Sequence, residues 1–298
     1  MSKYRAWLLL TAANLFWAGN YVFGKYVITE ITPLWITFSR WLLAIFFLFP
    51  IAYFLEKPKW QMVKQAWLQL VGMGLLGIIG YNMVLYSALE YTSSTNAALV
   101  SALNPAVIVL FSVFLLREKI SRLQTSGIVL SLIGAFVLIT QGNFGQLLQR
   151  EYNKGDILML AAVVIWTLYS IICRRLTIIP PITATAVSAL FATLIIAPFA
   201  IAQGIDVTKI SPLAVTGILY ITILPSVFSF VFWNMSVRAI GISQAGIFLN
   251  LIPVFTAIIS GILGERITGT QVLGGSLVFL GVYLTTGMLD RKINGLIR

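Results

Sequence analysis

The sequence contains no histidine and a single cysteine, Cys173, in 298 residues. One cysteine excludes an intramolecular disulfide. An enzyme would need a nucleophile with its base, a metal cluster or a close pair of acids, and the sequence offers none of these, nor a GxSxG motif. We therefore expect no enzymatic activity, no metal site and no cofactor.

Acidic residues are scarce too, since Asp and Glu together number nine. A proton relay through a bilayer usually depends on carboxylate or histidine side chains within the spanning helices, which bind and release the proton. Here the acids are expected at helix ends or in loops, which argues against an antiporter that binds organic cations on a buried glutamate. They are Glu30, Glu56, Glu90, Glu118, Glu151, Asp156, Asp206, Glu265 and Asp290.

Long apolar stretches dominate what is present. Hydrophobic residues make up 59% of the chain, charged residues 10%, and the mean hydropathy is +0.95. Apolar runs of about 20 residues, long enough to cross a bilayer as helices, recur throughout. The sequence predicts an all-α integral membrane protein with ten transmembrane helices, at 6–29, 33–54, 66–89, 93–115, 122–141, 155–176, 181–203, 212–236, 241–263 and 268–289.

The first run is expected to be a retained helix and not a cleaved signal peptide, because similar spans follow and no small-residue cleavage pattern precedes Lys25. The net charge of +11 reflects orientation. With the N-terminus placed inside, most Lys and Arg residues fall in cytoplasmic segments, as the positive-inside rule requires. We expect a multi-pass protein of the plasma (cytoplasmic) membrane with both termini cytoplasmic, and no nucleic-acid partner.

The two halves of the chain repeat each other. STNAALVSALNP followed by LLREKIS in the first half matches ISQAGIFLNLIP followed by LGERIT in the second, with Pro105 over Pro253 and Gly134 over Gly281. Each half holds an odd number of predicted spans, so the repeats should be inverted, a construction that many secondary transporters use. We predict a first repeat at 1–141, a connecting loop at 142–154, a second repeat at 155–290 and a cytoplasmic tail at 291–298.

These motifs, together with WAGNYVFGK in the first span and Arg40 in FSRWLLA, resemble the EamA branch of the drug/metabolite transporter superfamily. The resemblance covers nearly the whole chain. It implies ten helices around a central cavity, and its members commonly export amino acids or other small metabolites.

Helical spacing selects side chains that could line a path through the membrane. Asn14, Tyr21 and Lys25 share one stripe of the first helix, with Trp17 beside it. The spacing in both repeats, together with the intramembrane charge Arg40, gives a candidate substrate-binding set: Asn14, Trp17, Tyr21, Lys25, Arg40, Tyr81, Asn82, Tyr86, Ser101, Asn104, Trp166, Ser170, Phe230, Asn234, Gln244, Phe248 and Asn250.

Each candidate also has a structural explanation. Buried Asn, Gln and Ser side chains can simply join neighbouring helices, and Trp17 and Trp166 can be packing residues instead of a stacking wall. Pro105 and Pro253 can kink helices without serving a cavity. The glycines near Gly74 and the set around Gly134 are expected to permit close helix packing.

Lys25 and Arg40 stand inside apolar stretches, where a charge at a helix centre costs roughly 2.5–3.5 kcal/mol. One hypothesis is that both face the cavity and attract a carboxylate. The alternative is that they clamp helix ends through backbone carbonyls or lipid phosphates. Lys25 can also snorkel outward, with Glu30 partly neutralising it.

The sequence thus predicts an exporter of small metabolites, with amino acids or related carboxylate-bearing solutes first, working by alternating access and facilitated diffusion. A proton-coupled drug or nucleotide-sugar-like antiporter is the alternative, and a channel is the rival transport class. The expected partners are a small-molecule substrate and the lipid bilayer. The oligomeric state is open, and a monomer is compatible with the sequence.

Overall fold

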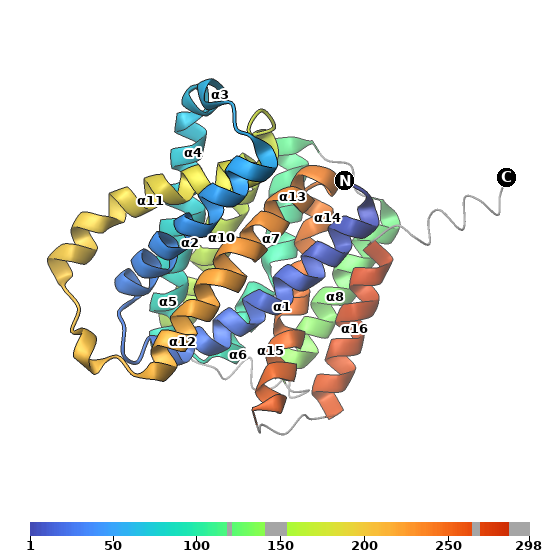
Figure 1. Ribbon diagram of the computed structural model, residues 1–298. Helices are drawn as coiled ribbons and strands as arrows, with labels where there is room; N and C mark the ends of the chain where they lie inside the picture. The colour runs from blue at the N-terminus through green and yellow to red at the C-terminus, as the bar shows by residue number, and fades with distance from the viewer. Residues whose placement is uncertain (118–120, 141–153, 264–268, 286–298) are drawn as a thin grey trace.

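The computed structural model describes residues 1–117, 121–140, 154–263 and 269–285, and every regular element in these ranges is a helix (Figure 1). Outside them lie the predicted tail, all of the predicted connecting loop except Lys154, and four of the acids, Glu118, Glu151, Glu265 and Asp290. The acids that are described lie in loops or at helix ends, as expected.

The helices of the first half of the chain are α1 (Lys3–Val27), α2 (Pro33–Glu56), α3 (Trp60–Gln65), α4 (Trp67–Met73), η1 (Gly74–Gly80), α5 (Tyr81–Tyr91), α6 (Ser94–Ser101), α7 (Asn104–Phe111), η2 (Ser112–Leu116) and α8 (Arg122–Thr140). Those of the second half are α10 (Lys154–Arg175), α11 (Pro181–Gln203), η3 (Val207–Lys209), α12 (Pro212–Ile221), η4 (Thr222–Ser229), α13 (Phe230–Ile240), α14 (Ile242–Ile247), η5 (Phe248–Asn250), α15 (Leu251–Ile262) and α16 (Gly269–Thr285).

Six described helices are long and apolar enough to cross a membrane: Pro33–Glu56, Trp67–Tyr91, Lys154–Arg175, Pro181–Gln203, Pro212–Ile240 and Ile242–Ile259. Asn14, Asn20 and Tyr21 lower the hydropathy of α1. The span predicted at 93–115 is interrupted between Ser101 and Asn104, just before Pro105. The count of ten spans therefore stays a prediction.

Local sequence explains where several helices begin. Pro33, Pro181 and Pro212 each occupy a first helical turn, where a missing N–H is tolerated. Ser211 precedes Pro212 and accepts a hydrogen bond from the Ala214 N–H through its hydroxyl at 3.2 Å. The starts expected near Pro181 and Pro212 are thus confirmed.

Two long helices contain a π-helical segment in the middle. η1 joins α4 to α5, and η4 joins α12 to α13 around Pro225. The wider π-turn lets Ser226 donate a hydrogen bond to the Ile221 carbonyl, five residues earlier, at 2.9 Å. Such segments are uncommon and frequently occur at functional sites. Both π-segments lie in helices that supply side chains to the site described below.

The helices pack in pairs taken from opposite halves of the chain. α2 runs against α11, α8 runs against α16, α1 packs on η4, α13 and α15, and α10 packs on η1, α5 and α6 (Figure 1). Between α8 and α16 the contact is nearly backbone to backbone. A Cβ at Gly134 would lie 2.7 Å from the Gly274 carbonyl oxygen, and a Cβ at Gly281 would lie 2.6 Å from that of Gly127. The packing role expected for the glycines around Gly134 is confirmed.

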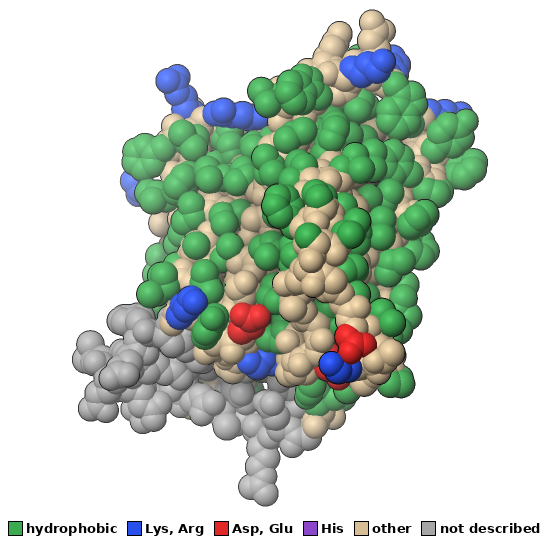
Figure 2. Space-filling model, turned by 90° about the vertical axis from the view of Figure 1, so that its left-hand side faces the viewer, with side chains coloured by type: hydrophobic (Ala, Val, Ile, Leu, Met, Phe, Trp, Pro, Cys, Tyr) green, Lys and Arg blue, Asp and Glu red, His purple; other side chains and the backbone are tan. Residues whose placement is uncertain are grey.

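The outer surface is mainly apolar. Figure 2 shows one face on which hydrophobic side chains predominate, while charged side chains lie toward its upper and lower ends. Large exposed residues on α2 and α11 include Phe46 (69%), Phe54 (73%) and Phe199 (64%). An exposed apolar surface of this extent, carried by helices long enough to cross a bilayer, indicates contact with lipid or with another membrane protein.

Two acidic side chains accept hydrogen bonds at the N-termini of other helices. Glu30 accepts hydrogen bonds from the backbone N–H (2.7 Å) and the hydroxyl (2.8 Å) of Ser211, ahead of α12. Glu56 accepts bonds from the N–H groups of Ile182 (2.9 Å) and Thr183 (2.7 Å) in the first turn of α11. Negative charge is favourable at helix N-termini. The Glu30 carboxylate therefore bonds to Ser211, and within the described ranges it forms no ion pair with Lys25.

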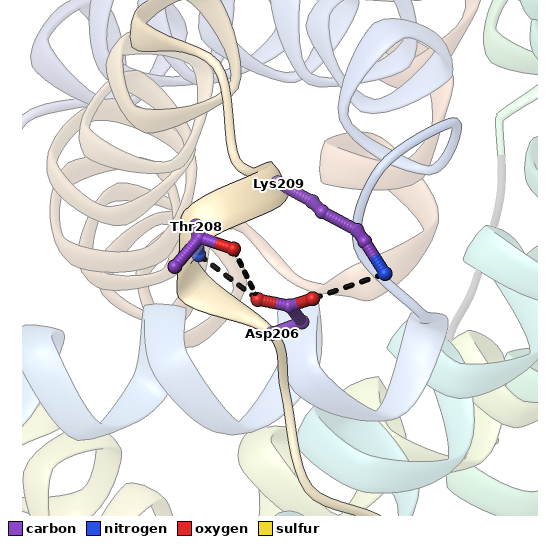
Figure 3. Close-up of polar contacts among 3 residues, drawn as sticks. All are labelled: Asp206, Thr208 and Lys209. Atoms are coloured by element: carbon purple, nitrogen blue, oxygen red, sulfur yellow. Dashed lines mark hydrogen bonds and ion pairs between the residues drawn. The ribbon is translucent and has the colours of Figure 1, made fainter.

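In the loop before α12, Asp206 organises a short turn (Figure 3). One of its carboxylate oxygens accepts from the hydroxyl (2.6 Å) and the N–H (3.2 Å) of Thr208, and the other lies 3.0 Å from the ammonium of Lys209. The pKa of Asp206 is lowered mainly by the hydrogen bond from the Thr208 hydroxyl, and to a smaller extent by the Lys209 ammonium. The pKa of Glu30 is lowered by the Ser211 N–H first and by its hydroxyl second.

The glycine contact predicts a steric difference between two positions on α16. Gly281→Ala should lower stability by about 1–3 kcal/mol, because the added methyl group would meet backbone on α8. Gly275→Ala should leave it almost unchanged, since its Cβ would lie 3.5 Å from a Val254 methyl group. Thermal melting of the two purified variants measures the difference, and equal melting temperatures would contradict the proposed packing.

The Glu30 contact predicts a pH dependence. Because the pKa of Glu30 is lower in the folded protein, its contribution to stability is complete above its ordinary value of about 4.3 and is lost as the pH falls through the lower folded value. The melting temperatures of the protein and of Glu30→Gln should therefore converge on acidification. Glu90→Gln is the control, and a gap in melting temperature that stays constant down to about pH 3 would refute the linkage.

Candidate functional site

Arg40 lies on α2 with its side chain turned into the protein, where only 1% of its surface is exposed. Its Nε donates to the Ser226 hydroxyl at 2.7 Å, and its Nη1 donates to the side-chain oxygens of Asn82 (2.8 Å) and Asn20 (3.3 Å). Nη1 also donates to the hydroxyl of Tyr86. All four acceptors are neutral, and they come from α1, α5 and η4.

The acceptors around Arg40 are oriented by further hydrogen bonds. The Tyr86 hydroxyl donates to the Asn20 side-chain oxygen at 2.8 Å. The Asn82 amide nitrogen donates to the carbonyl of Ile78 at 2.8 Å, so its oxygen is left facing the guanidinium. Each group thus has a defined donor or acceptor role, which makes the arrangement a polar network with little freedom.

No carboxylate contacts Arg40 within the described part of the chain. Its Cζ lies 5.6 Å from the ring centroid of Trp41 and 5.8 Å from that of Tyr86, within range of cation–π attraction. An arginine side chain keeps its charge in proteins. A buried charge without a counter-ion is costly in free energy, so this guanidinium is well suited to bind an anionic group of a ligand.

A cluster of aromatic rings fills the space beside the Arg40 network. The Trp17 and Trp166 rings meet edge to face at 5.2 Å, and Phe230 lies 5.4 Å from Trp166 and 4.8 Å from Trp41. Tyr81 lies 4.9 Å from Trp166. The cluster joins α1, α2, α5, α10 and α13 and adjoins the network through Trp41. Its edge-to-face geometry stabilises the packing of these helices against one another.

A second polar network adjoins the cluster through Tyr169, whose ring lies 5.0 Å from that of Trp166. The side-chain oxygen of Asn234 accepts from the Tyr169 hydroxyl at 2.8 Å and from the Cys173 thiol at 3.1 Å, and its nitrogen donates to the Thr185 hydroxyl at 2.8 Å. Ser170 lies beside this network and accepts a hydrogen bond from the Trp233 indole at 3.2 Å.

Lys25 is placed apart from Arg40, at the end of α5. Its ammonium group donates to the backbone carbonyls of Leu89 (2.5 Å) and Thr92 (3.0 Å). Arg174, in the last turn of α10, makes a similar bond, since it donates to the carbonyl of Arg238 at the end of α13 at 2.6 Å. Positive charge is favourable at helix C-termini. This geometry is the helix-end arrangement named as the alternative for Lys25.

The remaining candidate residues are buried on neighbouring helices. The hydroxyl groups of Tyr21 and Tyr81 lie 3.3 Å apart. Asn14 and Asn104 donate to carbonyls of their own segments, Leu10 at 2.6 Å and Ser101 at 2.8 Å, while Asn250 donates to the Ser131 hydroxyl at 2.6 Å. Their three side-chain oxygens have no hydrogen-bond partner in the described ranges. Ser101, Gln244 and Phe248 are also buried, with 1%, 7% and 3% of their surface exposed.

The structure therefore joins two groups of candidates: Arg40, Asn82 and Tyr86 in the network, and Trp17, Tyr81, Trp166 and Phe230 in the cluster. Sequence reasoning missed Asn20, Trp41, Ser226 and Trp233. Asn20 was detectable as an amide in the middle of an apolar span, and Trp41 directly follows Arg40. Ser226 gave no comparable signal, because a serine after a proline is common in helices at many depths.

No grouping of three or more Cys, Asp and Glu side chains that could hold a metal ion occurs in the described ranges, and the chain has no histidine to add to one. The polar groups at the centre are amides, hydroxyls and one guanidinium. These groups bind by hydrogen bonds and charge, so the arrangement is suited to recognising a solute.

Comparison with known proteins identifies the architecture. The sequence of an uncharacterized transporter of Bacillus subtilis, YyaM, is 28% identical over 97% of this chain and 96% of its own. A probable amino-acid metabolite efflux pump of Salmonella typhimurium is 26% identical over 90% of each chain. The aromatic amino acid exporter YddG of Ancylobacter novellus is 31% identical over 58% of this chain and 53% of its own.

A crystal structure of another protein superposes with a TM-score of 0.78, covering 96% of this chain and 97% of that one at 22% identity, which supports the fold. The pattern of the EamA-like transporter family matches residues 5–140 and 153–287. This chain is a multi-pass integral membrane protein that belongs to the EamA-like transporter family.

Proposed function

We propose that this transporter exports amino acids or related carboxylate-bearing solutes, and that Arg40 binds the carboxylate. The observation that carries the proposal is the buried guanidinium with four neutral acceptors and no described carboxylate beside it. A guanidinium matches a carboxylate with two parallel hydrogen bonds. A substrate carboxylate could thus replace some of the neutral acceptors and supply the missing negative charge.

The aromatic cluster gives the proposal its second part. Trp17, Trp166 and Phe230 offer ring faces and edges for an apolar or aromatic side chain next to Arg40. Two of the relatives are named an amino-acid metabolite efflux pump and an aromatic amino acid exporter, which favours the same substrate class. In this proposal Asn14, Tyr21, Ser101, Asn104, Ser170, Asn234, Gln244, Phe248 and Asn250 line the rest of the path.

Lys25 has a supporting role in this proposal. Its hydrogen bonds hold the C-terminal end of α5, the helix that carries Asn82 and Tyr86. It would therefore affect transport through the position of these two side chains and not through contact with the substrate carboxylate.

We further propose alternating access between two inverted five-helix repeats, residues 1–141 and 155–290, with both termini cytoplasmic in the cell membrane. Three observations support the repeats: the family pattern matches two stretches, η1 and η4 lie at corresponding places, and α8 and α16 pack reciprocally. Arg40 and the cluster are shielded in this conformation, so substrate entry requires helices to move. The π-segments and the break before Pro105 are the natural bending points.

Facilitated diffusion is the simplest energetic scheme for such a site. The described acids lie at helix ends or in loops, and Glu30 and Glu56 are engaged with helix N-termini. A proton-coupled drug or nucleotide-sugar-like antiporter is the alternative. It would need a titrating group in the path, and a buried tyrosine is the available candidate.

Substitution of Arg40 tests the proposed carboxylate site. Arg40→Gln should weaken binding of a carboxylate-bearing amino acid by about 10- to 100-fold, the loss expected for a hydrogen bond to a charged group. Binding of the corresponding decarboxylated amine should change much less. Counterflow in proteoliposomes, with the amine as competitor, measures both effects.

Two further variants separate binding from folding. Lys25→Gln is the matched control, because it removes a cation that lies at a helix end. It should lower the stability of the protein, but it should leave the ratio of the affinities for the acid and the amine nearly unchanged. Arg40→Lys should restore part of the affinity for the acid. If the folded Arg40→Gln variant binds the acid and the amine with equally reduced affinity, Arg40 is not the carboxylate site.

The energetic scheme makes a separate prediction. Amino-acid counterflow at equal pH on both sides should proceed at the same rate after an uncoupler is added, since no protonated carrier residue is required. An imposed pH gradient should not drive accumulation above equilibrium. Uphill uptake that follows the pH gradient and collapses with the uncoupler would favour the antiporter.

A further inference from the structure

An apolar groove lies on the outer surface where the C-terminal end of α2 meets α3 and α11, well away from Arg40. Its volume is about 360 Å³, and its walls include Phe49, Pro50, Tyr53, Trp60, Ala186 and Val187. The Trp60 ring stacks over that of Phe49 at 6.5 Å, which places α3 along one side of the groove. Both α2 and α11 are candidate membrane spans, so lipid chains could reach a groove between them.

A basic rim adjoins this groove. The chain leaves α2 at Lys57 in a left-handed conformation, with φ of 47°, and then passes through Pro58, which lines the groove, to Lys59. Lys57 and Lys59 also line a smaller neighbouring cavity of about 200 Å³, together with Glu56 and Ile178. Both lysine side chains are exposed.

The negative charge nearest to these lysines is already engaged. The two oxygens of Glu56 accept from the N–H groups of Ile182 and Thr183 and from the Thr183 hydroxyl at the start of α11. The backbone carbonyl of Lys59 accepts from the N–H groups of Met62 and Val63, but neither lysine side chain forms a hydrogen bond or an ion pair with another described residue. The rim therefore presents two cations at the edge of an apolar slot.

We propose that this groove is a binding site for an anionic phospholipid, with one acyl chain between α2, α3 and α11 and the headgroup on Lys57 and Lys59. The apolar walls match the acyl chain, and the paired lysines match a headgroup of net negative charge better than a zwitterionic one. An occupied site would hold α3 against α2 and α11 and thereby fix the α2 end next to the Glu56 contact.

The test uses the tryptophan in the groove. The full-length protein is reconstituted in two kinds of phosphatidylcholine vesicle. One contains a fixed fraction of brominated phosphatidylglycerol, and the other contains the same fraction of brominated phosphatidylcholine. Brominated acyl chains quench tryptophan fluorescence on contact. The difference between the protein and Trp60→Phe isolates the signal of Trp60 from the other tryptophans. Brominated phosphatidylglycerol should quench this signal about twofold more strongly than brominated phosphatidylcholine.

The double variant Lys57→Gln with Lys59→Gln should reduce quenching by the anionic lipid to the level of phosphatidylcholine. The control is the double variant Lys3→Gln with Arg5→Gln. It removes two cations of α1 that lie on the same predicted side of the membrane but do not line the groove, so it should leave the preference for the anionic lipid intact. Equal quenching by the two lipids, or a preference that survives in the Lys57 and Lys59 variant, would overturn the proposal. Absence of quenching by either lipid would also overturn it, because another protein surface, such as a second copy of the chain, would then cover the groove.

Discussion

A buried guanidinium with no counter-ion among the described residues is the constraint around which the centre of this transporter is built. Arg40 is 1% exposed and relies on neutral oxygens from α1, α5 and η4. Hydrogen bonds to neutral groups compensate only part of the desolvation of a charge, so the four acceptors must be held in position by the surrounding helices. Displacing any of these helices would leave the charge less well solvated, and the packing of the bundle and the state of Arg40 are therefore linked.

The irregular helices make this arrangement geometrically possible. Ser226 faces Arg40 from a π-helical segment and keeps its own donor bonded to the carbonyl five residues earlier. Asn82 lies two residues after the π-helical segment η1 and bonds to the carbonyls of Gly77 and Ile78 within it. A regular α-helix would rotate these side chains away. By contrast, α8 and α16 are joined by glycine contacts that fix their separation, so rigid and irregular parts of the fold lie in different helices.

Four charged side chains near the ends of helices, Lys25, Arg174, Glu30 and Glu56, contrast with Arg40. Lys25 and Arg174 both bond to carbonyls at helix C-termini, and Glu30 and Glu56 both bond to N–H groups at helix N-termini. In each case the charge complements the helix dipole and lies near an end of the bundle. Arg40 has no such partner, and this difference separates a candidate ligand-binding charge from charges that hold the ends of helices.

Composition and pattern in the sequence determined the helical membrane class, the family, and the starts of helices at Pro181 and Pro212, because hydropathy, proline chemistry and repeated motifs are local properties of the chain. They also identified Arg40, Asn82, Tyr86, Trp17 and Trp166 as candidates, since polar and aromatic residues in apolar spans are visible without coordinates. Only the tertiary structure decided that Lys25 bonds to Leu89 and Thr92 while Arg40 meets Asn20 and Ser226. Those pairings depend on the rotation of helices far apart in sequence and on π-turns, which no short-range pattern encodes.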